Sequence, residues 1–197
     1  MLFIAFCVFI SLYFFFDVNY YVRIWLTAAI ATVRGKNQRK RLLEEHIFRS
    51  ICLTTDLDFQ FHMNNARYLR DCDFARLAFW IETGIWETLK KLKGSVVVRS
   101  SHIRYRKSVE LFERYFVKSM LVYWDEKSFY VEHQIVRQRD NFVCAVNISE
   151  NAVVPSALTP QQVVDQFGLI NKPRLLPEVE KIIDANSMNS ERMKKLA

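Results

Sequence analysis

Glycine and proline are scarce in this chain of 197 residues, with four of each. A linker-rich or disordered chain is therefore not expected. The cysteines are also few and far apart, and they include no C-x-x-C pair, so neither a disulfide framework nor a metal site is expected. We predict that they are buried thiols of a reducing compartment: Cys7, Cys52, Cys72 and Cys144.

The sequence also lacks any recognisable nucleic-acid module, although its net charge is +7. No stripe of Arg and Lys interleaved with aromatic residues is present, so nucleic acid is not an expected partner. The positive charge suits an anionic membrane surface or a phosphorylated ligand. Apolar residues make up 51% of the chain, which is enough for a sizeable core. The length favours one domain with appendages.

The first residues form a long run without charge, "LFIAFCVFISLYFFF" from residue 2 to 16. As a helix with Met1 it would be about 24 Å long, slightly short of the ~27 Å core of the endoplasmic reticulum bilayer. Asp17 ends the run, and a second apolar stripe then recurs at helical spacing, which could lie in the headgroup plane. We predict a hydrophobic anchor or signal segment with a basic flank over residues 1–41. The stripe consists of Val22, Trp25, Leu26, Ala29, Ile30 and Val33.

Two locations remain open for the chain. Its basic residues follow the apolar run, which favours a cytosolic domain. The chain ends in "KKLA", and Lys194-Lys195 resembles a cytosolic retrieval signal of endoplasmic reticulum membrane proteins. We therefore expect anchoring in that membrane. The alternative is secretion after signal-peptide cleavage, because Ala29-Ile30-Ala31 fits the cleavage pattern. A lumenal domain would often carry a glycan on Asn147 of the Asn-Ile-Ser sequon.

The rest of the chain contains segments with strand patterns and one long segment with a helical pattern. A strand is predicted over residues 46–54, and a helical pattern runs from Asn64 to about Lys93 with a break at Gly84. Val-, Ile- and Tyr-rich segments follow, joined by turn sequences "WDEKS" and "RDN", which predicts an antiparallel meander. The fold class is α+β, an antiparallel sheet wrapped around a long central helix. We place this domain at residues 42–170 and a polar C-terminal tail at 171–197. The predicted strands are 95–106, 114–125, 128–139 and 142–149, with a short helix after Thr159-Pro160.

The window Asp58-Phe-Gln-Phe-His-Met-Asn-Asn-Ala-Arg-Tyr68 resembles the D-x-x-G-H-V-N-N-x-x-Y signature of hot-dog-fold acyl-CoA thioesterases. The order of elements over residues 46–167 resembles that fold. The apolar start, "SVVVRSSHIRYRKS" and "FVCAVN" resemble a membrane-associated branch of the superfamily. The resemblance implies a hot-dog fold, an acyl-CoA or related thioester as ligand, and a homodimer. It implies no metal and no cofactor, since coenzyme A enters only as part of the substrate.

The resemblance also assigns roles to individual residues. Asp58 stands at the position of the family's catalytic acid, where it could attack the thioester or activate water. His62 matches the family's histidine and could hold the loop or assist proton transfer. Gln60 stands where some acyl-carrier-protein thioesterases of this fold have Asn. Arg104, on the following strand, could meet the phosphates of coenzyme A.

Helix-start geometry supports the same site independently. Backbone N–H groups at a helix start are unsatisfied donors at the positive end of the helix dipole. Those of Asn64, Asn65 and Ala66 could stabilise an oxyanion, an effect of roughly 3 kcal/mol per donor. A purely structural interpretation is also available, because Asp and Asn are ordinary capping residues. We assign Asp56 to such a loop or cap role, and Asp73 and Arg76 to an ion pair three residues apart on the helix.

One position departs from the family signature. The glycine that lets the backbone approach the substrate is Phe61 in this chain. A phenylalanine ring there could narrow or close the pocket. We therefore keep two hypotheses, an acyl-CoA thioesterase and a catalytically inactive hot-dog protein that serves lipid metabolism as a binding or scaffold domain.

Overall fold

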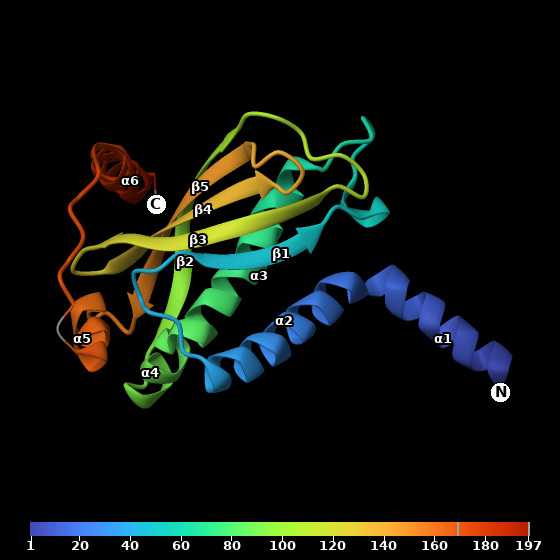
Figure 1. The fold of residues 1–197 in the computed structure, drawn as a ribbon, viewed down its shortest axis with the longest axis horizontal. Coiled ribbons are helices and arrows are strands. Elements are labelled where there is room, and N and C mark those ends of the chain that lie inside the picture. The colour runs from blue at the N-terminus through green and yellow to red at the C-terminus, as the bar shows by residue number, and fades with distance from the viewer. Residues whose placement is uncertain (169, 197) are drawn as a thin grey trace.

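The computed structural model of the chain describes residues 1–168 and 170–196. Ala197, the last residue of the "KKLA" motif, lies outside them. Five strands form one antiparallel sheet in the order β1-β3-β4-β5-β2, and the sheet curves around helix α3 (Figure 1). The predicted α+β arrangement of a sheet around a central helix is confirmed. The elements are β1 (His46–Ile51), α3 (Asn65–Thr83), β2 (Ser95–Tyr105), β3 (Arg114–Trp124), β4 (Ser128–Arg137) and β5 (Val143–Val154).

The predicted meander is confirmed for β3, β4 and β5. These three strands follow one another in the chain and lie side by side in the sheet. It is wrong for β2, which pairs with β5 at the far edge, with Ser95 opposite Val154. The segment 106–113 between β2 and β3 contains no glycine, proline or asparagine that would favour a tight hairpin turn. It instead crosses the end of the sheet (Figure 1). Strands β1 and β2 are consequently the two free edges.

Helix α3 owes its central position to a wide apolar face, which the sequence predicted. Phe74, Ala75 and Phe79 are fully buried. The helix ends where predicted, at Gly84, whose φ of 88° is the left-handed conformation that glycine adopts without strain. Helix α4 (Ile85–Lys91) begins directly after it. Full burial of each large apolar side chain contributes roughly 1.5–3 kcal/mol. Residues of α3 belong to two hydrophobic clusters against the sheet, one with Phe79 and one with Ala75.

Three of the cysteines are buried as predicted, and none forms a disulfide. Burial raises the pKa of Cys52 and of Cys72 to about 12, so both thiols stay protonated at neutral pH and are poor nucleophiles. The prediction is wrong for Cys7, which is exposed on the first helix.

The middle of the α3-facing side of the sheet is polar. His133 is fully buried there, with Nδ1 2.8 Å from Ser119 Oγ and Nε2 3.5 Å from Ser149 Oγ. Asn151 Nδ2 donates to Ser149 Oγ at 3.0 Å. Burial, together with the charge of Arg76, lowers the pKa of His133 well below its usual value. The folded protein therefore holds a neutral imidazole.

This histidine makes stability depend on pH. An unfolded His titrates near pH ~6.5, whereas the folded-state pKa of His133 is lower. As the pH falls toward ~6.5, the histidine of the unfolded chain takes up a proton while that of the folded chain stays neutral. The free energy of unfolding should therefore fall as the pH drops from 7.5 to 5.5. We expect a smaller fall for His133→Gln and an unchanged fall for His102→Gln, whose side chain is exposed. Urea titrations at each pH measure this, and equal slopes for His133→Gln and wild type would contradict it.

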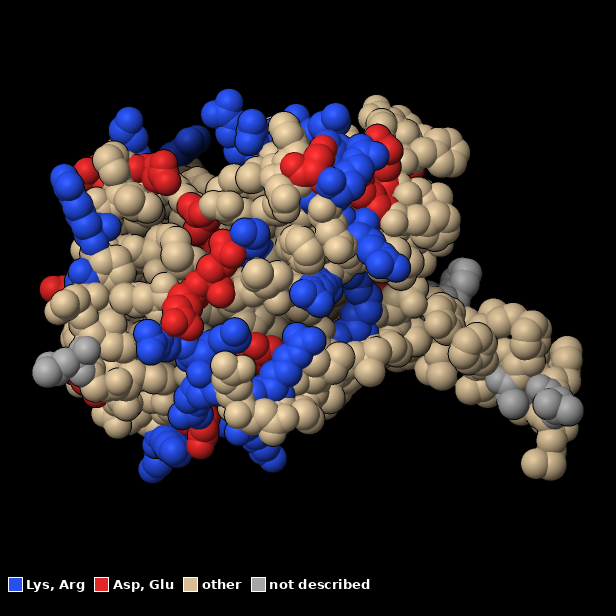
Figure 2. Space-filling view, in the orientation of Figure 1, with Lys and Arg blue, Asp and Glu red and all other residues tan. Residues whose placement is uncertain are grey.

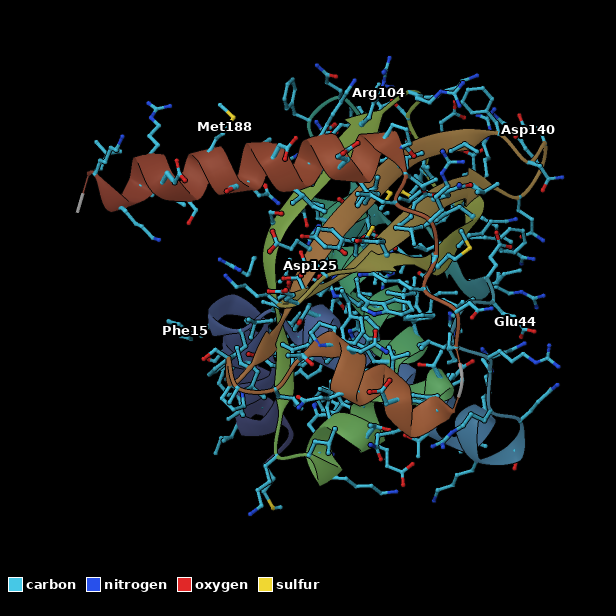
Figure 3. All side chains as sticks on the ribbon, turned by 90° about the vertical axis from the view of Figure 1, so that its left-hand side faces the viewer. Phe15, Glu44, Arg104, Asp125, Asp140 and Met188 are labelled. Atoms are coloured by element: carbon cyan, nitrogen blue, oxygen red, sulfur yellow. The ribbon has the colours of Figure 1, made fainter. Side chains whose placement is uncertain are left out.

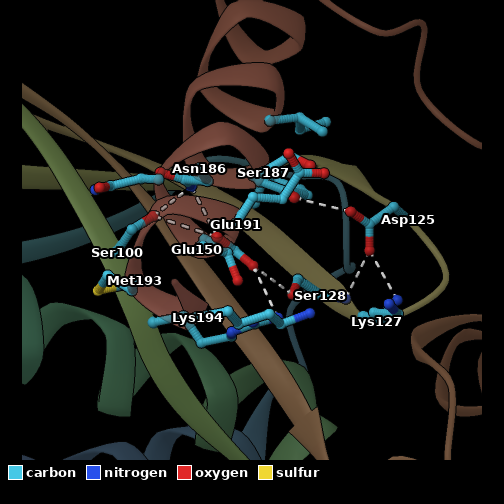
Figure 4. Close-up of a pocket in the computed structure, with 15 residues that line it drawn as sticks. Ser100, Asp125, Lys127, Ser128, Glu150, Asn186, Ser187, Glu191, Met193 and Lys194 are labelled. Atoms are coloured by element: carbon cyan, nitrogen blue, oxygen red, sulfur yellow. Dashed lines mark hydrogen bonds and ion pairs between the residues drawn. The ribbon is translucent and has the colours of Figure 1, made fainter. Parts of the chain in front are cut away.

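The predicted C-terminal tail contains helix α6 (Pro177–Lys194), which lies across the outer side of the sheet and extends beyond it (Figure 3). Val179 of α6 is buried with Tyr130 and Ile148. Asn186 donates to Ser100 Oγ at 2.6 Å and to Glu150 Oε2 at 2.7 Å (Figure 4). The lining of the cavity of about 400 Å³ beneath α6 includes Ser100, Glu150 and Asn186, which already bind one another. We interpret this cavity as part of the contact that holds α6 on the sheet.

Helix α5 (Pro160–Val164) precedes α6 and is capped by Thr159, as predicted.

Two further helices precede the sheet, α1 (Leu2–Phe15) and α2 (Val18–Asn37), and α1 projects away from the rest of the molecule (Figure 1). Among the described residues, no single helix has the length and apolar composition to cross a bilayer. The pair Phe6–Tyr13 and Val18–Asn37 meets that criterion only jointly, with a bend of 85°.

Helix α2 packs along α3, and a Cβ on Gly35 would lie 3.3 Å from the Glu82 backbone. The stripe predicted on α2 faces outward: Val22, Trp25, Leu26, Ala29, Ile30 and Val33 are all exposed.

The sequon offers no evidence on location. Asn147 is fully buried on β5, opposite His133 of β4. A glycan on this side chain is incompatible with the fold. Its absence would therefore not distinguish a cytosolic from a lumenal domain.

Candidate functional site

The loop before α3 is a small hairpin. Leu57 bridges Met63, the Asp58 N–H donates to the His62 carbonyl at 2.9 Å, and the Phe61 N–H donates to the Asp58 carbonyl at 3.1 Å. Three-residue hairpin loops of this kind end on a residue in the left-handed conformation. Phe61 is that residue, with φ of 60°. The family's glycine therefore stands where the turn requires a positive φ.

The phenylalanine does not fill the loop. Its side chain is 78% exposed, and the backbone has the conformation that glycine would adopt. The narrowing of a pocket by the Phe61 ring thus does not occur within one chain. The connection 106–113 contains a second exposed phenylalanine with a positive φ. Phe112 has a φ of 60° and is 62% exposed.

We expect Phe61→Gly to stabilise the protein. The left-handed conformation costs a non-glycine residue roughly 1–2 kcal/mol, partly offset by the greater freedom of glycine in the unfolded chain. The free energy of unfolding should rise by about 0.5–1 kcal/mol. Phe59→Gly is the matched control, since Phe59 is equally exposed but has no positive φ, and it should bring no gain. Urea denaturation of both variants decides the point, and a loss of stability in Phe61→Gly would refute it.

The start of α3 retains one free donor. The Asn64 side chain caps the helix by accepting the Ala66 N–H at 2.9 Å, and the Asn64 N–H donates to the Asp56 carbonyl at 2.8 Å. Within the described chain, the Asn65 N–H has no hydrogen-bond partner. Of the three amides predicted to hold an oxyanion, only that of Asn65 is available, at the positive end of the helix dipole.

Two tyrosines fix the helix start against the end of the sheet. The Tyr105 hydroxyl at the end of β2 donates to the Asn65 carbonyl at 3.0 Å. The Tyr68 hydroxyl, one turn into α3, accepts the Val109 N–H at 2.9 Å. The two rings meet edge to face, with centroids 5.3 Å apart. The free Asn65 amide is therefore held in place from both sides.

Most of the predicted site residues lie in this hairpin and at the start of α3. Asp58 is half-buried, and its Oδ1 accepts the Gln60 N–H at 2.9 Å. Gln60 and His62 are exposed, and the His62 imidazole has no hydrogen-bond or ion-pair partner among the described residues. The resulting surface offers one carboxylate, one imidazole and one amide donor around a helix start.

Arg104 does not join this group. Tyr105 points toward α3, whereas His102 contacts Asn186 of α6 on the opposite side of the sheet. Because side chains alternate along a strand, Arg104 points to the α6 side (Figure 3). In one chain it is therefore separated from Asp58 by the sheet, and its contact with phosphates stays a prediction.

Sequence reasoning missed the residue that connects α2 to this loop, Arg23. Its Nη1 lies 3.3 Å from Asp56 Oδ1, and its Nη2 lies 3.1 Å from Asp71 Oδ1. Both carboxylates are buried. Asp56 also accepts the Leu53 N–H at 3.0 Å, as the loop role assigned to it requires. Arg23 thus holds helix α2 against Asp56, which stands just before the Asp58 loop.

The carboxylates around Arg23 have further partners. Arg70 of α3 pairs with Asp56, and the Tyr115 hydroxyl donates to Asp71. Burial raises the pKa of Asp71 above its usual value even though Arg23 opposes that shift. A signal for this cluster was present in the sequence, since Arg23 is a single charge in a stretch of apolar and aromatic residues. Its partners, 33 and 48 residues away, could not be identified from spacing.

An antiparallel sheet curved around one helix, with a polar loop at the start of that helix, defines the class of hot-dog proteins. A sequence model of the Thioesterase-like superfamily matches residues 52–184. The chain belongs to the Thioesterase-like superfamily.

Named relatives agree with this assignment. Protein THEM6 of Xenopus laevis is 37% identical over 182 residues, which cover 90% of this chain and 85% of the relative. Protein THEM6 of Drosophila melanogaster is 31% identical over 190 residues, with 95% and 96% covered. Among solved structures, the probable thioesterase YbaW of Escherichia coli has a TM-score of 0.52 at 20% identity, and the match covers 61% of this chain and 96% of that chain. That likeness shows the hot-dog fold.

Proposed function

We propose that the chain hydrolyses or binds a fatty acyl thioester of coenzyme A at the endoplasmic reticulum membrane. The observation that carries this proposal is that Asp58 lies in the hairpin that leads directly into α3, whose first residue offers the free Asn65 amide, at the positions of the family signature. A carboxylate and a preorganised N–H donor are the two groups that thioester hydrolysis requires.

Hydrolysis at this site would use Asp58 in one of two ways. As a base, its carboxylate accepts a proton from water while the water oxygen bonds to the thioester carbon. The Asn65 N–H stabilises the oxyanion. Collapse breaks the carbon–sulfur bond, and the proton returns to the departing thiolate, giving a carboxylic acid and free coenzyme A. As a nucleophile, Asp58 forms an anhydride and expels the thiolate, and water then hydrolyses the anhydride.

The direct test is thiol release from a panel of acyl-CoAs by the full chain in detergent micelles. Release that is proportional to protein supports hydrolysis. The second candidate, a binding or scaffold protein, is favoured by the single free amide, since Asn64 and Ala66 are already bonded within the chain. Calorimetric binding of an acyl-CoA without thiol release would select that candidate.

The proposed membrane attachment rests on the two N-terminal helices. Helix α1 is apolar along its length, and the exposed stripe of α2 ends near Arg34 and Lys36. With their 85° bend, α1 can enter the hydrocarbon while α2 lies in the interface, where an amphipathic helix buries its apolar side. Basic residues follow, which favours a cytosolic domain.

The proposed homodimer rests on β2. This strand is a free edge, and it exposes Val97 and Val98. Edge strands of this kind pair readily with a second copy. Light scattering on the purified chain should give a dimer or a multiple of it, and a strict monomer would contradict the proposal.

A further inference from the structure

A groove runs between α2 and the edge strand β1, and it encloses about 310 Å³. Figure 1 shows α2 and β1 side by side. Among the described strands β1 pairs only with β3, so no described strand covers its other edge. The walls are apolar over most of their length: Leu26 and Ile30 of α2, Phe48, Ile51 and Leu53 of the β1 segment, and Ala78 of α3.

A polar pocket of about 440 Å³ adjoins this groove and shares Arg34, Arg49 and Glu82 with it. Lys40 also lines the pocket. Figure 2 shows Lys and Arg side chains gathered over the C-terminal half of α2 and the segment that leads to β1. The two cavities together form one amphipathic site, apolar in one half and charged in the other, where three cations accompany the carboxylates of Glu45 and Glu82.

In the polar half Arg49 can bind an anion, and Arg34 is held only by a long ion pair. Among the described residues no carboxylate pairs with Arg49, whose guanidinium lies over the Phe116 ring at 5.9 Å. Arg34 reaches Glu82 Oε1 only at 4.0 Å. Glu82 has a closer partner in His46, whose Nε2 lies 2.9 Å from Oε2. His46 also lines this pocket, is 2% exposed, and has a buried Nδ1 without a partner in the described structure.

The apolar half is continuous with the outward stripe of α2. Leu26 and Ile30 belong to both, and their side chains are about half exposed. A molecule that enters the groove from this stripe must be apolar and narrow, and one that reaches Arg34 and Arg49 must end in an anion. A volume near 300 Å³ is at the lower end of those of small-molecule sites.

We propose that the groove between α2 and β1 binds one acyl chain of an anionic membrane lipid, with its head group between Arg34 and Arg49. Neither cavity contains a residue of the Asp58 loop or of the start of α3. This site is therefore separate from the proposed thioester site, and binding to it requires no hydrolysis.

The test uses the full chain in neutral detergent micelles with a palmitic acid that carries a diazirine on its chain. After irradiation, the labelled peptides are identified by mass spectrometry. Label is expected in residues 26–34 and 48–53. Ile30→Trp fills the groove, and Arg49→Glu reverses the charge at the junction, so each should lower labelling of these peptides about tenfold.

Two matched variants control for surface effects. Val33→Trp adds the same ring on the same helix, and Lys36→Glu makes the same charge reversal, but neither residue lines the two cavities. Both should label like wild type. Equal labelling by an uncharged alcohol with the same chain would overturn the role of the arginines. Undiminished labelling in Ile30→Trp, or equal losses in the controls, would overturn the groove. Labelling that follows the expected pattern supports it even if thioester hydrolysis is absent.

Discussion

Asp58→Asn should lower kcat/KM for acyl-CoA hydrolysis by about 100- to 10,000-fold, the range that a positioned acid or base contributes. Asparagine keeps the shape and can still accept the Gln60 N–H that bonds to Asp58 Oδ1. The free energy of unfolding should therefore change by no more than ~0.5 kcal/mol. Thiol release and urea denaturation of the same preparation measure both quantities.

Two further substitutions separate this effect from general damage. Asp184→Asn makes the same charge change on the exposed surface of α6, and it should leave hydrolysis and stability unchanged. Asp56→Asn lies two residues from Asp58, but it removes a buried partner of Arg23 and Arg70 and should reduce stability. An Asp58→Asn variant that hydrolyses acyl-CoA at the wild-type rate would exclude this carboxylate from the reaction.

Arg23→Ala is expected to lower the free energy of unfolding by about 3 kcal/mol. Removing one partner of a buried ion pair typically costs 3–5 kcal/mol, because the remaining charge stays buried. We expect the lower end of this range, since Arg70 and Tyr115 still bind Asp56 and Asp71. The Asp58 loop follows Asp56 directly, so the same variant should also lose activity at temperatures where it remains folded.

The control for this variant is Arg41→Ala. Arg41 pairs with Glu44 at 3.7 Å on the exposed surface, where such pairs contribute about 0–1 kcal/mol. Arg23→Lys keeps the charge but loses the two-pronged guanidinium, and an intermediate stability is expected. If Arg23→Ala and Arg41→Ala unfold at the same urea concentration, the buried cluster does not hold α2 in place.

Local sequence signals predicted much of the fold. The break at Gly84, the Thr159 cap and the two hairpin turns each depend on a few neighbouring residues, and all are present. The place of β2 depends instead on pairing between strands about 50 residues apart, which no local pattern encodes. Helix α6 was overlooked because most of its residues are polar. The residues that it packs against the sheet have helical spacing that could have revealed it: Val179, which is buried, and Ile182 and Ile183, which are partly buried.

The candidate site, too, was predicted only as far as local sequence signals reach. The motif placed Asp58, His62 and the start of α3 in one loop. It could not show that Asn64 uses its own side chain as the cap, which leaves Asn65 as the single free amide. It also could not show that Phe61 keeps the backbone of a glycine while its ring faces solvent. The motif could not show that Arg104 points to the α6 side, because that depends on which residues of β2 face α3 in the folded sheet.

The most direct test of the proposed site is a crystal structure of the full chain with an acyl-CoA analogue in which an NH group replaces the thioester sulfur, so that a stable amide keeps the carbonyl. The account predicts the carbonyl oxygen of the analogue within hydrogen-bond distance of the Asn65 N–H, with the Asp58 carboxylate beside the carbonyl carbon. An analogue bound with its carbonyl remote from the start of α3 would contradict the account.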